Sequence, residues 1–196
     1  MVKSKLVFAS TNTHKIAEVK ELFKNSDYEI LSLLDFPEIA DVDETADTLI
    51  GNAKLKAETI AKQINLPVFA DDSGFFVDAL DGAPGVHSAR WTGTHRDYAT
   101  QNAKILDLME NESNRNASYE TVIAFVQNHD EKTRIFIGVM PLEVAKTETI
   151  IDGFSYDTIV TYNGKYVAEM TSDEKNQVSS RAKAVDKFKH FLDGLV

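Results

Sequence analysis

The chain has 196 residues, of which 43% are hydrophobic and 27% are charged, as in an ordinary globular protein. It has no cysteine, which excludes disulfides, thiolate metal sites and cysteine nucleophiles and favours a reducing, cytoplasmic setting. A net charge of -10 disfavours nucleic acid polymers and anionic membranes as partners, and no stretch predicts a signal peptide or a membrane span.

The first half of the sequence alternates between predicted strands and helices, the pattern of an α/β protein. Apolar runs predict strands at 5–10, 29–34 and 66–71, and helical spacing predicts helices at 13–25, 45–64 and 97–112. The second half predicts a hairpin of long strands at 118–128 and 133–140, a smaller hairpin across Asn163 and Gly164, and a closing amphipathic helix from residue 180. No linker or repeat divides the chain.

The polar segment FASTNTHK, residues 8–15, joins the first predicted strand to the first predicted helix. Backbone N–H groups at a helix N-terminus, together with Lys15, are suited to bind phosphate. The same residues fit an ordinary Ser/Thr/Asn helix cap beside a surface lysine. On this segment alone, the cap is the favoured interpretation.

The predicted helix at 45–64 has Lys56 at the edge of its apolar stripe, while Lys54 and Lys62 point further away. A lysine in such a position usually extends to solvent, and on spacing alone this is the favoured interpretation. Glu44, just before the helix, fits either a metal ligand or a favourable charge at the helix N-terminus.

The segment FADDSGFFVDALDGAPGVHSARW, residues 69–91, has two adjacent aspartates after an apolar run. In an extended strand Asp71 and Asp72 would point to opposite faces, whereas a turn at Ser73 and Gly74 would let both reach one cavity. One aspartate could then hold a metal while the other orients a water. Mg²⁺ uses one or two carboxylates plus substrate phosphates, which Glu44 and an aspartate would supply. A solvated turn with aspartate caps fits equally well.

Five segments together resemble the successive motifs of the inosine triphosphate pyrophosphatase family, the Ham1-like nucleotidases. They are STNTHK, ETADTLIGNAKLKA, FADDSGFFVDALDGAPGVHSARW, GFSYD and DEKNQVSSRAKA, in family order over nearly the whole chain. The resemblance implies an α/β fold with an elongated mixed β-sheet, flanking helices and two lobes around a central cleft, as one domain over residues 1–196. It also implies a homodimer that hydrolyses ITP, dITP and XTP to the monophosphate and pyrophosphate, with Mg²⁺ as cofactor and Mn²⁺ as a possible substitute.

The resemblance further implies roles for single residues. Glu44 and Asp71 match the metal ligands, and Asp72 matches the general base. The phosphate loop is matched by Ser10, Asn12 and Lys15, and a further phosphate-binding lysine is matched by Lys56. The turn beside the aspartates is matched by Ser73 and Gly74. The base-binding segment is matched by Phe154 and Asp157, and the C-terminal substrate contacts are matched by Lys175, Ser180 and Arg181. A bound metal ion and the cations of the phosphate-binding residues would then offset the electrostatic repulsion between the two adjacent aspartates.

The departures from the family pattern concern the nucleotide base. Ser155 and Thr158 replace the glycine and proline of Phe-Gly-Tyr-Asp-Pro, and Ser180 replaces the histidine of Ser-His-Arg. The segment 138–153 also lacks the usual glycine and arginine pattern. We therefore expect preserved phosphate chemistry with altered base selectivity. Two alternatives stay open: a pyrophosphatase of broad or different base preference, as in Maf-like nucleotidases, and a nucleotide-binding sensor with little turnover.

Overall fold

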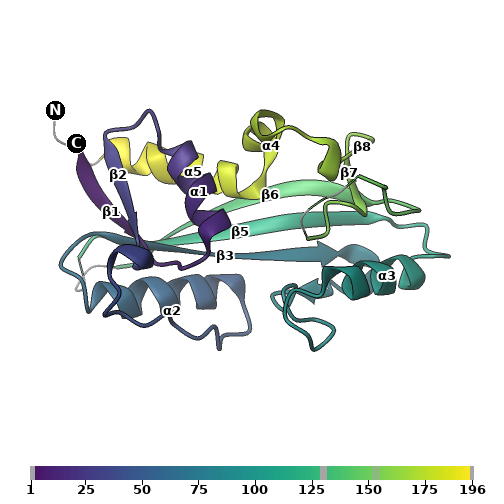
Figure 1. Ribbon diagram of the computed structural model, residues 1–196, viewed down its shortest axis with the longest axis horizontal. Helices are drawn as coiled ribbons and strands as arrows, with labels where there is room; N and C mark the ends of the chain where they lie inside the picture. Colours follow the sequence, from purple (N-terminus) through teal and green to yellow (C-terminus); the bar gives the residue numbers. More distant parts are fainter. Residues whose placement is uncertain (1–2, 129–131, 152, 154, 195–196) are drawn as a thin grey trace. The chain divides into compact units, whose positions relative to one another are not determined.

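The computed structural model describes residues 3–128, 132–151, 153 and 155–194. These residues form a mixed α/β fold with an open sheet and flanking helices (Figure 1). None of the helices in this part of the chain is long and apolar enough to cross a membrane.

The sheet contains both parallel and antiparallel pairs. Its strand order over the described residues is β2-β1-β3-β5-β6-β7-β8, with β4 paired to β3 off this path. β1 runs parallel to β2 and β3, whereas the pairs β3–β4, β6–β7 and β7–β8 are antiparallel. The strand bounds are β1 (Ser4–Phe8), β2 (Tyr28–Ser32), β3 (Val68–Val77), β4 (Pro84–Gly85), β5 (Asn116–Val126), β6 (Arg134–Val144), β7 (Val160–Tyr162) and β8 (Lys165–Tyr166).

Four of the five α-helices among the described residues, α1 to α4, begin at polar caps. Asn12, Thr48, Asp97 and Thr171 each cap a helix by accepting backbone N–H bonds with their side chains. The helix bounds are α1 (Thr13–Leu22), α2 (Leu49–Ala61), α3 (Tyr98–Leu108), α4 (Ser172–Val178) and α5 (Ser180–Asp193). Short 3-10 turns follow β2 (Leu33–Asp35), β3 (Asp78–Leu80) and β8 (Val167–Glu169).

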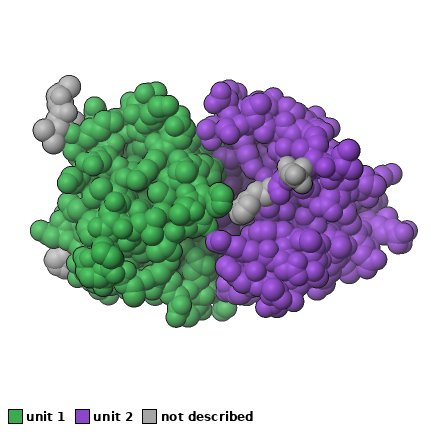
Figure 2. Space-filling model, in the orientation of Figure 1, with its two compact units in different colours: residues 1–72, 121–138, 181–196 green, residues 73–120, 139–180 purple. Residues whose placement is uncertain are grey.

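The chain divides into two compact units (Figure 2). Unit 1 comprises residues 1–72, 121–138 and 181–196, and unit 2 comprises residues 73–120 and 139–180. The long strands β3, β5 and β6 contribute residues to both units.

In unit 1, α1 and α5 cover one face of the strands and α2 covers the other (Figure 1). The α1 and α5 side is packed with aromatic rings, including Phe69 of β3 against Phe188 of α5 at 5.2 Å between centroids. Val185, Phe188 and Leu192 are all buried here, which confirms the predicted apolar face of the closing helix.

Unit 2 has its own core between α3 and the distal halves of the long strands. Phe75 of β3 stacks on Tyr156 at 4.6 Å, and Ile105 of α3 and Met140 of β6 are fully buried in the same cluster. At the Asn163–Gly164 turn the two residues have φ of 50° and 80°, which confirms the predicted small hairpin between β7 and β8. Of the predicted turn between the long strands, residues 129–131 lie outside the described residues.

Several predicted boundaries are wrong: β6 runs past residue 140 to Val144, and α3 ends at Leu108 instead of residue 112. The helix predicted from residue 45 begins at Leu49, because Thr48 caps it and Ala46 instead donates its backbone N–H to the Asn52 side chain at 2.8 Å. The strand predicted to end at Asp71 continues to Val77. Residues 172–178 also form the short helix α4, which the sequence analysis did not predict.

The continued strand also replaces the turn predicted at Ser73 and Gly74. Both residues lie inside β3, where β4 pairs alongside. A Cβ added at Gly74 would lie 2.7 Å from the carbonyl oxygen of Gly85. Glycine at this position therefore allows two strands to approach closely, and it does not turn the chain.

Candidate active site

The carboxylates of Asp71 and Asp72 leave β3 on opposite faces of the sheet. Asp71 accepts hydrogen bonds from Lys15 of α1 at 2.9 Å and from Arg181 of α5 at 3.0 Å. Asp72 accepts one from Asn52 of α2 at 3.0 Å. The alternation of an extended strand therefore holds at this pair, and all five side chains belong to unit 1.

Asp71 is the centre of a buried ionic cluster. Its two carboxylate oxygens accept from Lys15 and Arg181 respectively, and Arg181 also donates to Glu18. Burial alone would raise the pKa of Asp71, but these two cations outweigh it and lower the pKa below its ordinary value. Burial alone would likewise lower the pKa of Arg181, and Asp71 and Glu18 raise it. Asp71 is thus a firmly ionised partner for the cations that flank it.

Lys56 points inward from α2 and does not extend to solvent. It is only 6% exposed, and its ammonium group donates to Glu44 at 2.5 Å and to the backbone oxygen of Asp71 at 2.6 Å. The solvent interpretation favoured by spacing alone is therefore wrong for Lys56. Lys54 does extend outward, with a side chain 46% exposed and Glu58 at 3.8 Å.

Asp72 has the pKa of a group that can exchange a proton near neutral pH. Burial raises its pKa to about 6, Lys56 opposes this rise, and Glu44 adds to it. The influence of Glu44 means that two carboxylates share one neighbourhood with the Lys56 ammonium. Asn52 holds one Asp72 oxygen, and it also accepts the backbone N–H of Ala46.

The loop between β1 and α1 forms the expected helix cap. Asn12 accepts the backbone N–H groups of His14 at 3.1 Å and Lys15 at 3.3 Å, while Ser10 accepts that of Asn12 at 3.2 Å. The predicted cap is confirmed, but Lys15 is not a surface lysine, since its side chain is 22% exposed and bonds to Asp71 at 2.9 Å. The predicted phosphate contacts of Ser10 and Asn12 stay predictions.

The other predicted substrate residues belong to unit 2, except Phe154, which lies outside the described residues. Asp157 is buried and accepts from the Tyr119 hydroxyl at 3.1 Å and from the Lys175 ammonium. Ser180 is the first residue of α5 and is buried. Each predicted cation, in either unit, is therefore bonded to a predicted carboxylate: Lys15 and Arg181 to Asp71, Lys56 to Glu44, and Lys175 to Asp157.

Two residues of the cluster were missed by the sequence analysis, namely Asn52 and Glu18. Asn52 precedes Lys56 by four positions, so both lie on the same side of α2. The sequence signal for Asn52 was therefore a polar residue four positions before a lysine at the edge of the apolar stripe. The role of Glu18 depends on Arg181, which is far away in the sequence, so no local pattern indicates it.

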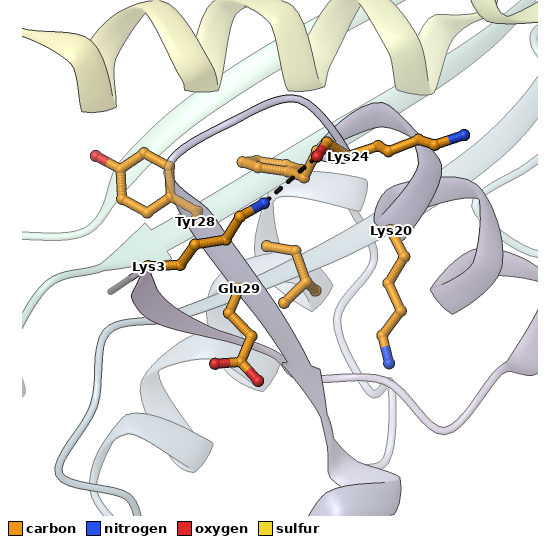
Figure 3. Close-up of a pocket in the computed structure, with 7 residues that line it drawn as sticks. Lys3, Lys20, Lys24, Tyr28 and Glu29 are labelled. Atoms are coloured by element: carbon orange, nitrogen blue, oxygen red, sulfur yellow. Dashed lines mark hydrogen bonds between the residues drawn. The ribbon is translucent and has the colours of Figure 1, made fainter. Parts of the chain in front are cut away.

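A separate hollow of about 310 Å³ lies on unit 1 at the end of α1 and beside β2 (Figure 3). It is lined by Lys3, Lys20, Phe23, Lys24, Tyr28, Glu29 and Ile30. Two of its three lysines have partners within the chain, since Lys3 donates to the backbone oxygen of Lys24 and Lys24 pairs with Glu21. It shares no residue with the Asp71–Asp72 cluster, and we assign it no role.

No group of three or more His, Cys, Asp or Glu side chains in the described residues is arranged to hold a metal ion. Glu44 and Asp72 are nevertheless close enough for one to raise the pKa of the other. A two-carboxylate arrangement matches how proteins hold Mg²⁺, which takes its remaining ligands from water and substrate phosphates.

A profile of the Ham1 family matches residues 6–191. The chain belongs to the Ham1 family. A relative named dITP/XTP pyrophosphatase from Listeria monocytogenes is 39% identical over 197 residues, covering 98% of this chain and 97% of its own. Another of the same name from Flavobacterium johnsoniae is 42% identical over 185 residues, covering 93% of this chain and 95% of its own.

Solved structures of the Ham1 family share the fold. The Ham1 protein of Staphylococcus aureus is 34% identical, with a TM-score of 0.89 over 98% of this chain and 100% of its own. A nucleoside-triphosphatase, or dITP/XTP pyrophosphatase, from Mycobacterium abscessus is 35% identical, with a TM-score of 0.77 over 94% and 98% of the two chains. The predicted mixed α/β fold and the Ham1-like resemblance are therefore confirmed.

Proposed function

We propose that this Ham1-family chain hydrolyses noncanonical purine nucleoside triphosphates, such as ITP, dITP and XTP, to the nucleoside monophosphate and pyrophosphate. The names of its full-length relatives support this activity. The single observation that carries it is Asp72, a buried carboxylate with a pKa of about 6 beside the Lys56 ammonium. A base near neutrality next to a buried cation suits water activation on a phosphate substrate.

The cations of unit 1 neutralise the triphosphate. Lys15, Lys56 and Arg181 now donate to carboxylate oxygens, and Lys56 also donates to a backbone carbonyl. A triphosphate has more negative charge than a single carboxylate, so it competes for the same ammonium and guanidinium groups. These groups are then already oriented where charge develops during phosphoryl transfer.

Asp72 receives the proton of the attacking water. The water oxygen bonds to the α-phosphorus, and the bond from that phosphorus to the bridging oxygen of the pyrophosphate breaks. Pyrophosphate leaves with the electron pair of the broken bond, and the lysines offset its charge. Asn52 keeps the Asp72 carboxylate in one orientation during this step.

We infer that Glu44 and one oxygen of Asp72 would hold the Mg²⁺ ion, in place of the predicted ligand Asp71, while the other Asp72 oxygen takes the proton of the attacking water. Both oxygens of Asp71 accept from cations, whereas Glu44 lies near enough to Asp72 to raise the pKa of Asp72. This revision gives Asp71 the task of positioning Lys15 and Arg181. A bound divalent cation would supply charge neutralisation at the phosphates.

The test is a product assay on a panel of nucleoside triphosphates. Pyrophosphate and orthophosphate are measured separately for dITP, XTP, dATP and dGTP, with Mg²⁺, with Mn²⁺ and with excess EDTA. We expect pyrophosphate from dITP and XTP with either cation and none with EDTA. Equal rates on dATP would indicate the broad-specificity alternative, and stoichiometric binding without turnover would indicate the sensor.

We also propose that the enzyme works as a homodimer in the cytoplasm. The Ham1 resemblance supports the dimer, and the cysteine-free composition is compatible with a reducing compartment. Light scattering coupled to size exclusion measures the oligomeric state, and cell fractionation measures the location. A monomeric mass at micromolar concentration would contradict the dimer.

A further inference from the structure

Every residue from 155 to 158, just before β7, is anchored to another part of unit 2. The backbone oxygen of Ser155 accepts from Asn102, and the Tyr156 hydroxyl contacts Gln101 and the backbone oxygen of Ser88. Asp157 accepts from Tyr119 and Lys175, and the Thr158 hydroxyl bonds to Asn102 and Glu148. Such complete anchoring of irregular backbone is typical of a segment whose position matters for binding.

The contacts among Asn102, Thr158 and Glu148 form a directed chain of hydrogen bonds. The Thr158 hydroxyl donates to Glu148 at 2.5 Å, so its oxygen is free to accept from the Asn102 amide at 3.0 Å. The same amide group donates to the backbone oxygen of Ser155 at 3.2 Å. Since all its neighbours here are acceptors, the orientation of the Asn102 amide is fixed by the network. We call these three side chains the clasp.

The clasp holds a backbone conformation that serine does not favour. Ser155 has a φ of 63°, in the left-handed region where glycine is at ease and where the family usually has glycine. Thr158 stands where the family usually has proline, which restricts its own φ without any partner. Glycine and proline would favour this backbone conformation by themselves. In this chain, hydrogen bonds from Asn102 to Ser155 and Thr158 take over that task.

The space around Thr158 supports a tight fit. A Cβ added at Gly153 would lie 2.8 Å from the Thr158 methyl group and 2.9 Å from the Cβ of Ala168. Thr158 is 8% exposed and Asn102 is 3% exposed, so the hydrogen bond between them is shielded from water, whereas Glu148 is exposed. Thr158 is thus held both by close packing and by the clasp.

We propose that Asn102, Thr158 and Glu148 are positioning residues that set base selectivity by holding residues 155–158 in their binding conformation. This inference rests on the proposed function and on the role that the family resemblance implies for Asp157, a contact with the purine base. The ligand is the base of a noncanonical purine nucleoside triphosphate. The clasp acts through the segment and does not touch the phosphates, so it changes the affinity for the base and leaves the chemical step alone.

The test compares Thr158→Val, which keeps the shape and removes the hydroxyl, with Thr158→Ser, which keeps the hydroxyl. Thr161→Val is the matched control, because its hydroxyl makes only an exposed contact at 3.5 Å to the backbone of Glu143. Each variant is measured for kcat and KM on dITP and dATP. Hydrogen exchange is measured by mass spectrometry on peptides covering residues 155–158.

We expect Thr158→Val to raise KM for dITP about five- to thirtyfold with kcat within about twofold, and to lower the dITP to dATP ratio of kcat/KM. Exchange should speed up at residues 155–158, while Thr158→Ser and Thr161→Val behave like the unmodified protein. Asn102→Ala should act like Thr158→Val, and adding Ser155→Gly should recover part of the loss, because glycine needs no anchor at this φ.

An unchanged KM for dITP together with unchanged hydrogen exchange at residues 155–158 in Thr158→Val would overturn the proposed role of the clasp. So would faster exchange with unchanged selectivity, or an equal loss of kcat/KM on both nucleotides, which indicates a general structural role. A chain without pyrophosphatase activity would refute the proposed function on its own, and the unmodified protein reveals this before any variant is compared.

Discussion

Asp71 and Asp72 are neighbours in β3, yet their carboxylates bond to helices on opposite faces of the sheet. One is held by Lys15 and Arg181 and has a lowered pKa, and the other is held by Asn52 and has a pKa raised to about 6. Two environments thus give one pair of identical side chains two chemical characters. The first anchors cations and the second can move a proton.

Replacing Asp72 tests whether it acts in the mechanism as base and metal ligand. Asp72→Asn keeps the shape and the contact with Asn52 but cannot take a proton at neutral pH, so we expect turnover of dITP to fall at least about a hundredfold. Steady-state pyrophosphate release at saturating substrate measures this. Near-normal turnover would remove Asp72 from the mechanism.

Replacing the lysines tests phosphate neutralisation. Lys15→Ala and Lys56→Ala should each lower kcat/KM for dITP by about 2–4 kcal/mol, because both act on the charge of the triphosphate. Lys54→Ala is the control, since its side chain is exposed and forms a surface ion pair with Glu58 at 3.8 Å. Equal small effects at all three positions would contradict the assignment.

The division of labour between the aspartates predicts different metal affinities. Glu44→Gln and Asp72→Asn should weaken Mn²⁺ binding at least about tenfold, whereas Asp71→Asn should change it less than about threefold. Asp71→Asn should instead lower the free energy of unfolding by about 3–5 kcal/mol, because buried cations lose their partner. Calorimetric Mn²⁺ titration and urea unfolding measure the two effects. Loss of Mn²⁺ binding in Asp71→Asn alone would restore it as the ligand.

The raised pKa of Asp72 predicts a pH-dependent stability in the metal-free protein. Its pKa rises from an ordinary 3.8 to about 6 on folding, so its contribution is present below pH 3.8 and is lost as pH rises through about 6. At about 1.36 kcal/mol per unit, the difference amounts to about 3 kcal/mol. Urea unfolding in EDTA should therefore show Asp72→Asn gaining stability over the unmodified protein between pH 4 and 7. A constant difference across this range would contradict the shift.

The serine at the start of α5 predicts modest base discrimination. A serine hydroxyl reaches less far than the histidine that the family usually has, and a water filling the gap accepts a 6-oxo or a 6-amino group alike. Ser180→His should therefore raise the ratio of kcat/KM for ITP over ATP by about 1–3 kcal/mol, while Ser180→Ala changes it little. A roughly thousandfold preference for ITP in the unmodified protein would contradict this expectation.

Much of the fold could be predicted because its signals are local. Apolar alternation and helical spacing indicate β1, α1, α3 and α5, and an Asn-Gly pair indicates the β7–β8 hairpin. The extent of β3 could not be predicted, since Gly74 looks like a turn residue until Gly85 is found against it. Tertiary partners, not local preference, decide such positions.

The candidate site was likewise predictable only where its signals are local in the sequence. The residue types of the aspartate pair and the lysines are visible in the sequence, and the family motifs name them. The burial of Lys56 was not visible, because it depends on Glu44 and on a backbone oxygen of β3. The clasp could not be predicted either, because its three side chains come from separate segments and share no sequence motif.

Neither unit is a continuous stretch of chain, because the backbone passes between them after residues 72, 120, 138 and 180. The core of unit 1 includes Phe8 from the first strand and Phe188 from the last helix. The ribosome makes the segment containing Phe188 after those containing Phe8, Phe69 and Phe125, so this core cannot close until α5 has emerged. Folding of unit 1 therefore waits for α5, and a nascent chain stalled before residue 181 should leave Phe69 and Phe125 without their packing partner.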